Sequence, residues 1–373
     1  MKNFATAASL FALTTGAAFA GGLDRSGQPV GIIFEQGNYG ELSFSSTTPT
    51  VSGADLATTG TTGNVADSFI QATGGVKFDV DEQLSIALIF DTPFGSDINY
   101  PVNATSVLLG GTSAVATATS TSLVARYKFN ENFSAHGGLR LQSASGDIAL
   151  NGLAYGPLAG YNVSLGQDQA LGYLVGFAYE KPEIALRIAL TYNSAITHKF
   201  NTFETLNGAP INPAGFSTTE VETPQSINLD VQSGIAKDTL LFGSVRWAEW
   251  SAFRIDPAVF TGLAGGGLVD LEDTVTYTIG VGRKFSDQFS GSVSLTYEAE
   301  SDDDLVSPLA PTNGLFAVSL GGRYTMDNTV LSGGIRYSWL GDAFAETGTP
   351  DTARGEFTDN TALSVGFKIG FNF

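Results

Sequence analysis

The chain has 373 residues, with 45 glycines and no cysteine, and only 15% of its residues are charged. This charged share lies below the ~25% typical of soluble domains, and the lack of cysteine excludes thiolate metal sites and a cysteine nucleophile. The formal net charge of -19 argues against nucleic acid as a partner.

The first predicted element is an export signal over residues 1–20. Lys2 precedes an apolar stretch from Phe4 to Leu13, and Ala18-Phe19-Ala20 forms a small-x-small cleavage site before Gly21. The apolar stretch is too short to span a bilayer as a helix. We therefore expect an exported chain that matures at Gly21 and carries a short N-terminal segment, 21–38, before its first strand.

Period-two alternation then predicts one β-domain over residues 39–373. One face of the last segment is apolar and carries Leu363, Val365, Phe367, Ile369, Phe371 and Phe373. The other face is small or polar, as expected for a strand with lipid outside and a polar lumen inside. The same pattern recurs in fourteen segments, which we predict as strands near residues 39–51, 65–80, 83–99, 116–130, 132–148, 168–181, 183–199, 219–236, 239–255, 273–286, 288–301, 314–326, 329–340 and 360–373.

The connections between these segments alternate in length. Short polar turns such as Lys237-Asp238 and Asp327-Asn328 alternate with long Gly/Pro/Asn-rich loops such as 151–166 and 256–271. Short periplasmic turns and long extracellular loops are typical of outer-membrane barrels. The predicted fold is therefore all-β, a 14-stranded antiparallel transmembrane β-barrel in the bacterial outer membrane.

The sequence carries no recognisable catalytic or metal-binding pattern. His136 and His198 are the only histidines and lie far apart, and Gly265–Gly267 lacks the Lys-Ser/Thr of a phosphate loop. We predict a protein that is not an enzyme and needs no metal or cofactor.

Three segments resemble the FadL family of outer-membrane transporters for long-chain fatty acids and other hydrophobic compounds, which includes the TodX-type channels for aromatic hydrocarbons. Residues 223–230 (TPQSINLD) lead to residues 245–253 (VRWAEWSAF), and residues 189–194 (ALTYNS) are similar to another family strand. The order of strands and turns matches from about Tyr39 to Phe373. Two features differ: the family's Asn-Pro-Ala hatch sequence is absent, and Ser145 stands where the family has a ligand-binding arginine.

The resemblance implies a monomer whose N-terminal segment forms a hatch inside the barrel. Ligand would land in a groove between two extracellular loops, reach an inner pocket and leave sideways past a kink in the third strand. The implied function is passive uptake of fatty-acid-like or aromatic molecules, with the bilayer and lipopolysaccharide as surroundings. A general porin for small hydrophilic solutes and a structural or adhesive barrel are the alternatives.

Two sets of residues match parts of this scheme. Pro93 cannot donate a strand hydrogen bond and Gly95 permits a bend, so these two residues predict the strand-3 kink. Two loops are unusually apolar for exposed connections, and an exposed apolar patch usually marks a binding surface. The candidate groove residues are Leu153, Tyr155, Leu158, Tyr161, Phe203, Leu206 and Ile211.

A fatty acid would also need a cation for its carboxylate, because burying that charge alone is costly. A cation on the lipid face would cost ~2–4 kcal/mol, so the cations on polar strand faces should point into the lumen. The candidates, in order, are Arg254, Arg140, Arg246, Arg187, Arg336 and Lys368. The alternative is that these cations only pair with lumen acids such as Asp91, Asp230, Glu298 and Glu300.

Overall fold

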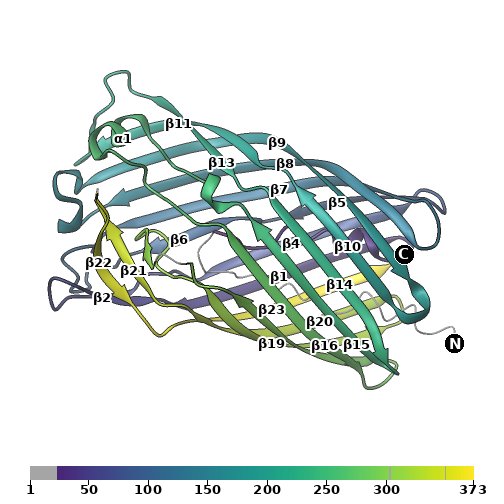
Figure 1. Cartoon of the computed structure of the whole chain (residues 1–373). Helices are drawn as coiled ribbons and strands as arrows, with labels where there is room; N and C mark the ends of the chain where they lie inside the picture. The colour runs from purple at the N-terminus through teal and green to yellow at the C-terminus, as the bar shows by residue number, and fades with distance from the viewer. Residues whose placement is uncertain (1–22, 302–303, 349) are drawn as a thin grey trace.

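The computed structural model describes residues 23–301, 304–348 and 350–373, so the predicted export signal lies outside the described residues. The chain forms a closed barrel of fourteen antiparallel strands (Figure 1). This confirms the predicted fold class. None of the described helices is long and apolar enough to cross a membrane.

Three of the fourteen barrel strands are interrupted and consist of two labelled segments each. In chain order the strands are β1 (Tyr39–Thr50), β4 (Phe69–Asp79), β5 (Leu84–Asp91) with β6 (Gly95–Asn99), β7 (Ser113–Lys128), β8 (Phe133–Leu150), β9 (Tyr161–Lys181), β10 (Leu186–Asn193) with β11 (Ile196–Leu206), β13 (Ser217–Thr223) with β14 (Ser226–Ala236), β15 (Thr239–Ala248), β16 (Thr274–Lys284), β17 (Phe289–Glu298), β19 (Leu315–Met326), β20 (Thr329–Leu340) and β23 (Asn360–Asn372).

The first and last strands close the barrel. β1 pairs with β23 over its whole length, from Tyr39 opposite Asn372 to Thr50 opposite Thr361. We call the end of the barrel that carries the short turns and the C-terminus the turn end, and the opposite end the loop end (Figure 1). At the turn end, Asp238 and Asp327 adopt positive φ angles, which suit the tight turns that join neighbouring strands.

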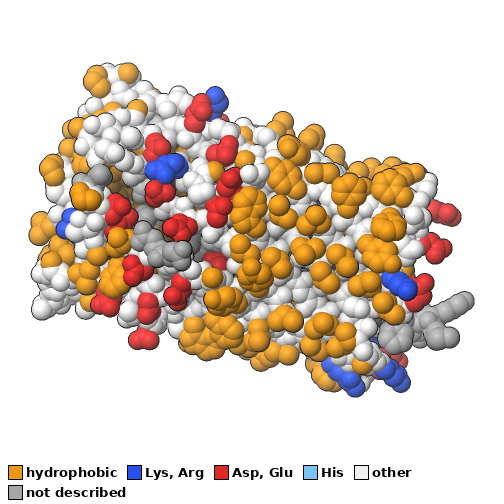
Figure 2. Space-filling model, in the orientation of Figure 1, with side chains coloured by type: hydrophobic (Ala, Val, Ile, Leu, Met, Phe, Trp, Pro, Cys, Tyr) orange, Lys and Arg blue, Asp and Glu red, His pale blue; other side chains and the backbone are white. Residues whose placement is uncertain are grey.

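The outer wall carries a belt of apolar side chains nearer the turn end, whereas acidic side chains gather nearer the loop end (Figure 2). On β9, Leu171, Tyr173, Val175 and Phe177 point outward and are between 44% and 70% exposed, while Leu174 and Ala178, on the opposite face of the strand, are buried. The observed parity therefore agrees with the predicted lipid and lumen faces.

The loop end is covered by structure that belongs to the long connections. A five-stranded sheet forms from β2 (Ser52–Asp55), β3 (Thr61–Asn64), β18 (Leu305–Val306), β21 (Ala343–Thr347) and β22 (Thr352–Phe357). The remaining elements are β12 (Ala209–Pro210), helix α1 (Ala258–Ala264) and the 3-10 turns η2 (Gly31–Phe34), η3 (Leu153–Leu158), η4 (Pro182–Ile184) and η5 (Trp250–Ala252).

Three predicted boundaries were wrong. The strand predicted over 183–199 continues to Leu206 within β11. The loop predicted over 151–166 is shorter, because β9 begins at Tyr161 and pairs there with both β8 and β11 beyond the apolar belt. The strand predicted over 239–255 ends at Ala248, because the buried Trp250 turns the chain inward and packs on Phe94 with ring centroids 5.3 Å apart.

The N-terminal segment lies inside the barrel. Its turn η2 buries Ile32, Ile33 and Phe34 against inward-facing residues of β5, β7, β9 and β10. Phe34 also lies 4.6 Å below the guanidinium carbon of Arg126 and 4.8 Å from that of Arg187. Cation–π contacts of this kind stabilise by ~0.5–2 kcal/mol each, so the hatch is attached to one side of the wall.

Candidate hydrophobic binding site

The third strand is broken where Pro93 was predicted to kink it. Asp91 in β5 lies opposite Ser120 and Gly95 in β6 lies opposite Thr117, so the broken strand carries one residue more than β7 over this stretch. An extra residue of this kind bends a strand out of its ladder. Pro93 has no N–H group to donate to the ladder, and although the Phe94 carbonyl still accepts from the Ala118 N–H of β7, other groups at the break bond the hatch.

The hatch docks on this break. The Pro93 carbonyl accepts the Arg25 N–H at 2.8 Å, and the Gly95 N–H donates to the Leu23 carbonyl at 2.9 Å. The Arg25 side chain donates from Nε to the Gly95 carbonyl at 2.9 Å and lies 3.3 Å above the ring of Phe69 in β4. Arg25 therefore bridges the second and third strands where their ladder is interrupted.

The same hatch segment contacts the opposite wall. Asp24 accepts from Arg246 Nε at 2.6 Å, Gln28 Oε1 accepts from Ser226 Oγ at 2.7 Å, and Asn228 donates to the Gly27 carbonyl at 2.9 Å. Residues 23–28 thus cross the lumen and divide it into two cavities.

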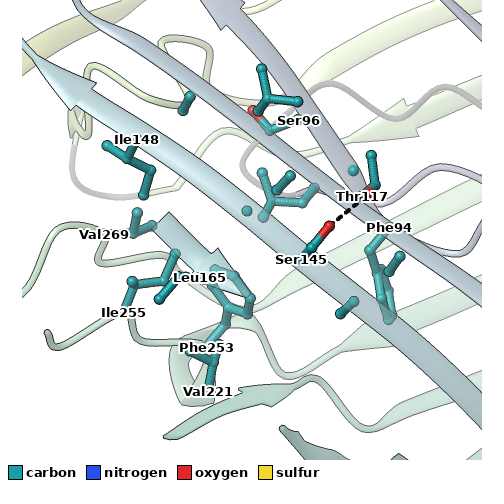
Figure 3. A pocket seen from close by; sticks show the side chains of 18 of the residues that line it. Phe94, Ser96, Thr117, Ser145, Ile148, Leu165, Val221, Phe253, Ile255 and Val269 are labelled. Carbon is teal, nitrogen blue, oxygen red and sulfur yellow. Dashed lines mark hydrogen bonds between the residues drawn. The ribbon is translucent and has the colours of Figure 1, made fainter. Parts of the chain in front are cut away.

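On the loop-end side of this partition lies an apolar cavity of about 70 Å³ (Figure 3). Its floor includes Leu23, and its wall is made of small side chains of β7 and β8, among them Ala114, Ala118 and Ala144. Small inward residues leave the space that larger ones would fill. Phe94, Phe200 and Phe253 supply aromatic surface, and no lysine or arginine is among the lining residues.

The roof of the cavity comes from the loop between β15 and β16, which contributes Phe253, Ile255 and Val269 (Figure 3). One buried carboxylate fixes this loop. Glu204 of β11 accepts from the N–H groups of Val259 and Phe260 at 3.2 and 2.8 Å, at the start of α1, and from Tyr161 Oη at 2.9 Å. A negative group at the first turn of a helix satisfies its free N–H groups.

One edge of the cavity is lined by polar side chains that carry no formal charge. His198 and Thr223 line it, and behind them lies the fully buried Gln142. Asp168 accepts from His198 Nδ1 at 3.0 Å. Burial lowers the pKa of His198 from its ordinary value of 6.5, and the neighbouring Asp168 opposes that shift. The imidazole is therefore neutral at pH 7.

On the turn-end side of the partition lies a polar chamber of about 320 Å³. Hydroxyl side chains such as Thr276 and Thr278 line it together with Asp230, Arg187 and Arg246. Asp230 lies beyond salt-bridge distance from both arginines and is exposed to the chamber. A carboxylate without a direct partner favours water, so this chamber suits water, whereas the cavity above it is apolar.

The structure places the six predicted head-group cations outside the apolar cavity. Five are in the lumen: Arg140 bonds Ser122 and Asn193, Arg187 bonds Gln232, Arg246 bonds Asp24, Arg336 bonds Ser338, and Lys368 pairs with Glu41 at 3.1 Å. Arg254 lies beyond the end of β15, is 45% exposed and pairs with Asp256 and Asp270. Arg254 therefore does not lie on the polar face of a barrel strand, contrary to the prediction, because β15 ends at Ala248.

The predicted loop-groove residues do not form one exposed surface. Leu153 is 73% exposed, whereas Tyr155, Leu158, Leu206 and Ile211 pack as half-buried side chains on the core beneath. Phe203 packs against Phe216 at 5.2 Å, and Tyr161 is fully buried. Phe203 and Leu206 belong to β11 and not to a loop.

Sequence reasoning missed the polar edge and the hatch contacts of Arg25. The candidate arginine position, Ser145, bonds Thr117 on the neighbouring strand at 3.2 Å (Figure 3). The alternation on β8 places Gln142, three residues before Ser145, on the inward face, and this signal could have indicated the polar edge.

Comparison with known proteins identifies the family. Residues 36–372 match the family described as outer membrane protein transport protein (OMPP1/FadL/TodX). The chain belongs to this family. Its members are transport proteins of the bacterial outer membrane for hydrophobic compounds, so the predicted resemblance and location are confirmed.

Solved structures share the fold at low sequence identity. A FadL homologue of Pseudomonas aeruginosa is 15% identical with a TM-score of 0.74, over 96% of this chain and 97% of that one. The toluene transporter TodX of Pseudomonas putida is 13% identical with a TM-score of 0.65, over 96% and 98% of the two chains. The toluene transporter TbuX of Ralstonia pickettii is 10% identical with a TM-score of 0.61, over 92% of each chain. No curated protein matches the sequence.

Proposed function

We propose that this chain is a monomeric channel for the passive uptake of small, neutral, hydrophobic molecules, with single-ring aromatic compounds as the best fit. One observation carries the proposal. The cavity on the loop-end side of the hatch is apolar and aromatic, and no lysine or arginine is among the residues that line it. Burying an ionised carboxylate without a partner is very costly, so a neutral ligand suits this cavity better than a fatty acid.

The size of the cavity supports the same choice. Its volume of about 70 Å³ is smaller than the ~150 Å³ of an apolar protein cavity that binds benzene. Side chains would therefore have to move apart to admit even a single ring, and a larger ligand would require a larger movement. A long alkyl chain would have to pass the hatch, whose residues Asp24 and Gln28 are tied to β14 and β15.

The two sides of the hatch also favour a sideways exit. Straight ahead of the cavity lies the polar chamber, which suits water and in which a hydrocarbon would lose the ~25 cal/mol per Å² gained on leaving water. To the side lies the break at Pro93. In the described chain, β4 forms a ladder with β5 only from Gly74 onward, so Phe69–Thr73 has no ladder partner on that side. Movement of Arg25 would open this route to the bilayer.

The cavity can be tested by filling it. Ala118 lines the cavity, and Ala118→Leu is expected to reduce toluene uptake by proteoliposomes at least tenfold. Ala125→Leu is the matched control, because Ala125 lies on the same strand and is exposed on the outer face. Toluene uptake that is equal in the two variants would refute the proposed cavity.

A general porin is the competing function, and the same proteoliposomes test it. A porin predicts rapid swelling in small sugars, whereas a hatch that crosses the lumen predicts little. Fast sugar flux through the wild-type protein would contradict the proposed function whatever the toluene result.

A further inference from the structure

The polar edge of the cavity is built from three strands. Gln142 comes from β8, His198 from β11 and Thr223 from β13, and none of the three side chains is more than 6% exposed. His198 and Thr223 line the cavity, whose other surface is almost wholly apolar. Polar groups placed against an apolar cavity lose hydration, so their hydrogen bonds must be accounted for one by one.

Gln142 joins the other two. In the assigned orientation its Oε1 is 3.0 Å from His198 Nε2 and accepts from Thr223 Oγ1 at 2.9 Å. Its Nε2 is buried without a hydrogen-bond partner among the described residues. Thr223 Oγ1 also lies 3.3 Å from the Ile196 carbonyl. In this orientation the amide nitrogen of Gln142 is therefore a buried donor that lacks an acceptor in the described part of the chain.

Reversing the amide does not remove this deficit. A neutral His198 that donates from Nδ1 to Asp168 must accept at Nε2, which requires the amide nitrogen of Gln142 on that side. Gln142 Oε1 then takes the place of the unpartnered nitrogen. One orientation therefore lacks an acceptor and the other lacks a donor. Gln142 does not line the cavity, so a ligand hydroxyl can meet the cluster at Thr223, whose oxygen keeps a lone pair in either orientation of the amide.

We propose that Gln142, His198 and Thr223 form a subsite for one neutral hydroxyl group on a ring-sized ligand, so that the channel takes phenol-type compounds in addition to hydrocarbons. This inference rests on the proposed uptake function and specifies the substrate class of the same cavity. The ring occupies the apolar space beside Phe200 and Phe253, and the ligand hydroxyl hydrogen-bonds Thr223, whose side chain is bonded to the Gln142 amide behind it. The subsite carries no cation, so it does not select for a carboxylate.

A purely structural role is the competing explanation. The three residues lie beside the interruptions at 194–195 and 224–225, where the sheet lacks ladder bonds, and their side chains tie the strands together there. A structural tie would affect every ligand of the cavity alike. A hydroxyl subsite affects only ligands that carry the group.

Phenol and toluene separate the two roles, because they differ by a hydroxyl in place of a methyl. Binding of each would be measured calorimetrically on the full-length protein in detergent, with empty micelles subtracted. Thr223→Val removes the hydroxyl and keeps the shape, and we expect it to weaken phenol binding about 3- to 10-fold, as for the loss of one hydrogen bond, with toluene binding unchanged. Thr202→Val is the matched control, since Thr202 is equally buried on β11 but bonds Phe200 and Thr219.

The outcomes are distinct. Equal losses for phenol and toluene, or no loss of phenol binding, would overturn the subsite. Failure of the wild-type protein to bind toluene would instead refute the proposed function. Should Thr223→Val not fold, the wild-type protein still separates the two explanations. A subsite predicts that the binding free energy of phenol is more favourable than its free energy of transfer from water into a hydrocarbon. An apolar cavity alone predicts that the two free energies agree.

Discussion

Replacing Arg25 by alanine should open the side of the barrel. The side chain makes a charge-assisted hydrogen bond to the Gly95 carbonyl at 2.9 Å and lies 3.3 Å above the Phe69 ring. The bond stabilises by ~1.5–3 kcal/mol and the ring contact by ~0.5–2 kcal/mol. A loss of about 2 kcal/mol, near the lower limit of that sum, shifts the equilibrium between closed and open states about 30-fold towards open.

The readout is the initial rate of toluene uptake by proteoliposomes. We expect Arg25→Ala to be faster than wild type and Arg25→Lys to be intermediate, since lysine keeps the charge and loses the planar group that stacks on Phe69. Arg283→Ala is the control, because Arg283 bonds Thr239 at the exposed turn end. An Arg25→Ala rate no higher than that of Arg283→Ala, in barrels that fold equally, would refute the role of Arg25 as the closing contact.

Three further predictions concern the loop end. Glu204→Ala leaves three buried or part-buried hydrogen-bond donors without an acceptor, at a cost of ~1–3 kcal/mol each. The loop that carries α1 should therefore be cleaved by protease several-fold faster in Glu204→Ala than in Glu204→Gln. Equal cleavage of the two variants would contradict this. Burial lowers the pKa of His198, so at acidic pH the unfolded chain binds a proton there that the folded chain does not. The free energy of unfolding, measured by urea titration, should therefore fall as the pH drops through 6.5. The same titrations of His198→Asn should show a shallower fall. Arg254→Ala removes only exposed ion pairs of ~0–1 kcal/mol and should leave toluene uptake unchanged, whereas a selective loss of fatty-acid binding would support the head-group role predicted from sequence.

The barrel wall could be predicted from sequence because its signal is local. Lipid requires an apolar residue at every second position of a strand, so Leu171 and Val175 alternate visibly with Gly172 and Gly176. Loop boundaries lack this constraint. Tyr161 begins β9 in a region that faces water on the outside, where alternation with lipid no longer applies, and its pairing with β8 and β11 had to come from the structure.

The site could be predicted only in part, because its contacts join residues far apart in the sequence. Pro93 is a local signal and marked the position of the strand break. The partner of that break, Arg25, lies some 70 positions away in a segment whose sequence has no periodicity. Lumen parity correctly turned Arg140 and Arg246 inward, but parity does not say whether an inward cation meets a ligand or another polar side chain. In this barrel both arginines donate to polar side chains of the protein, Arg140 to Ser122 and Arg246 to Asp24.

The seam between β1 and β23 also bears on how the wall can be assembled. Twelve residue pairs join strands from opposite ends of the barrel's sequence, and the Phe373 N–H donates to the Asn38 carbonyl at 3.2 Å. Each other strand is adjacent in sequence to its neighbour, so a growing sheet can add strands one after another, while its two edges stay unpaired until the final strand is present. The seam is therefore the step of highest contact order. Since the two edges meet so closely, a chain joined at 38 and 373 and reopened at Asp238 would present the same ring of strands with its seam elsewhere.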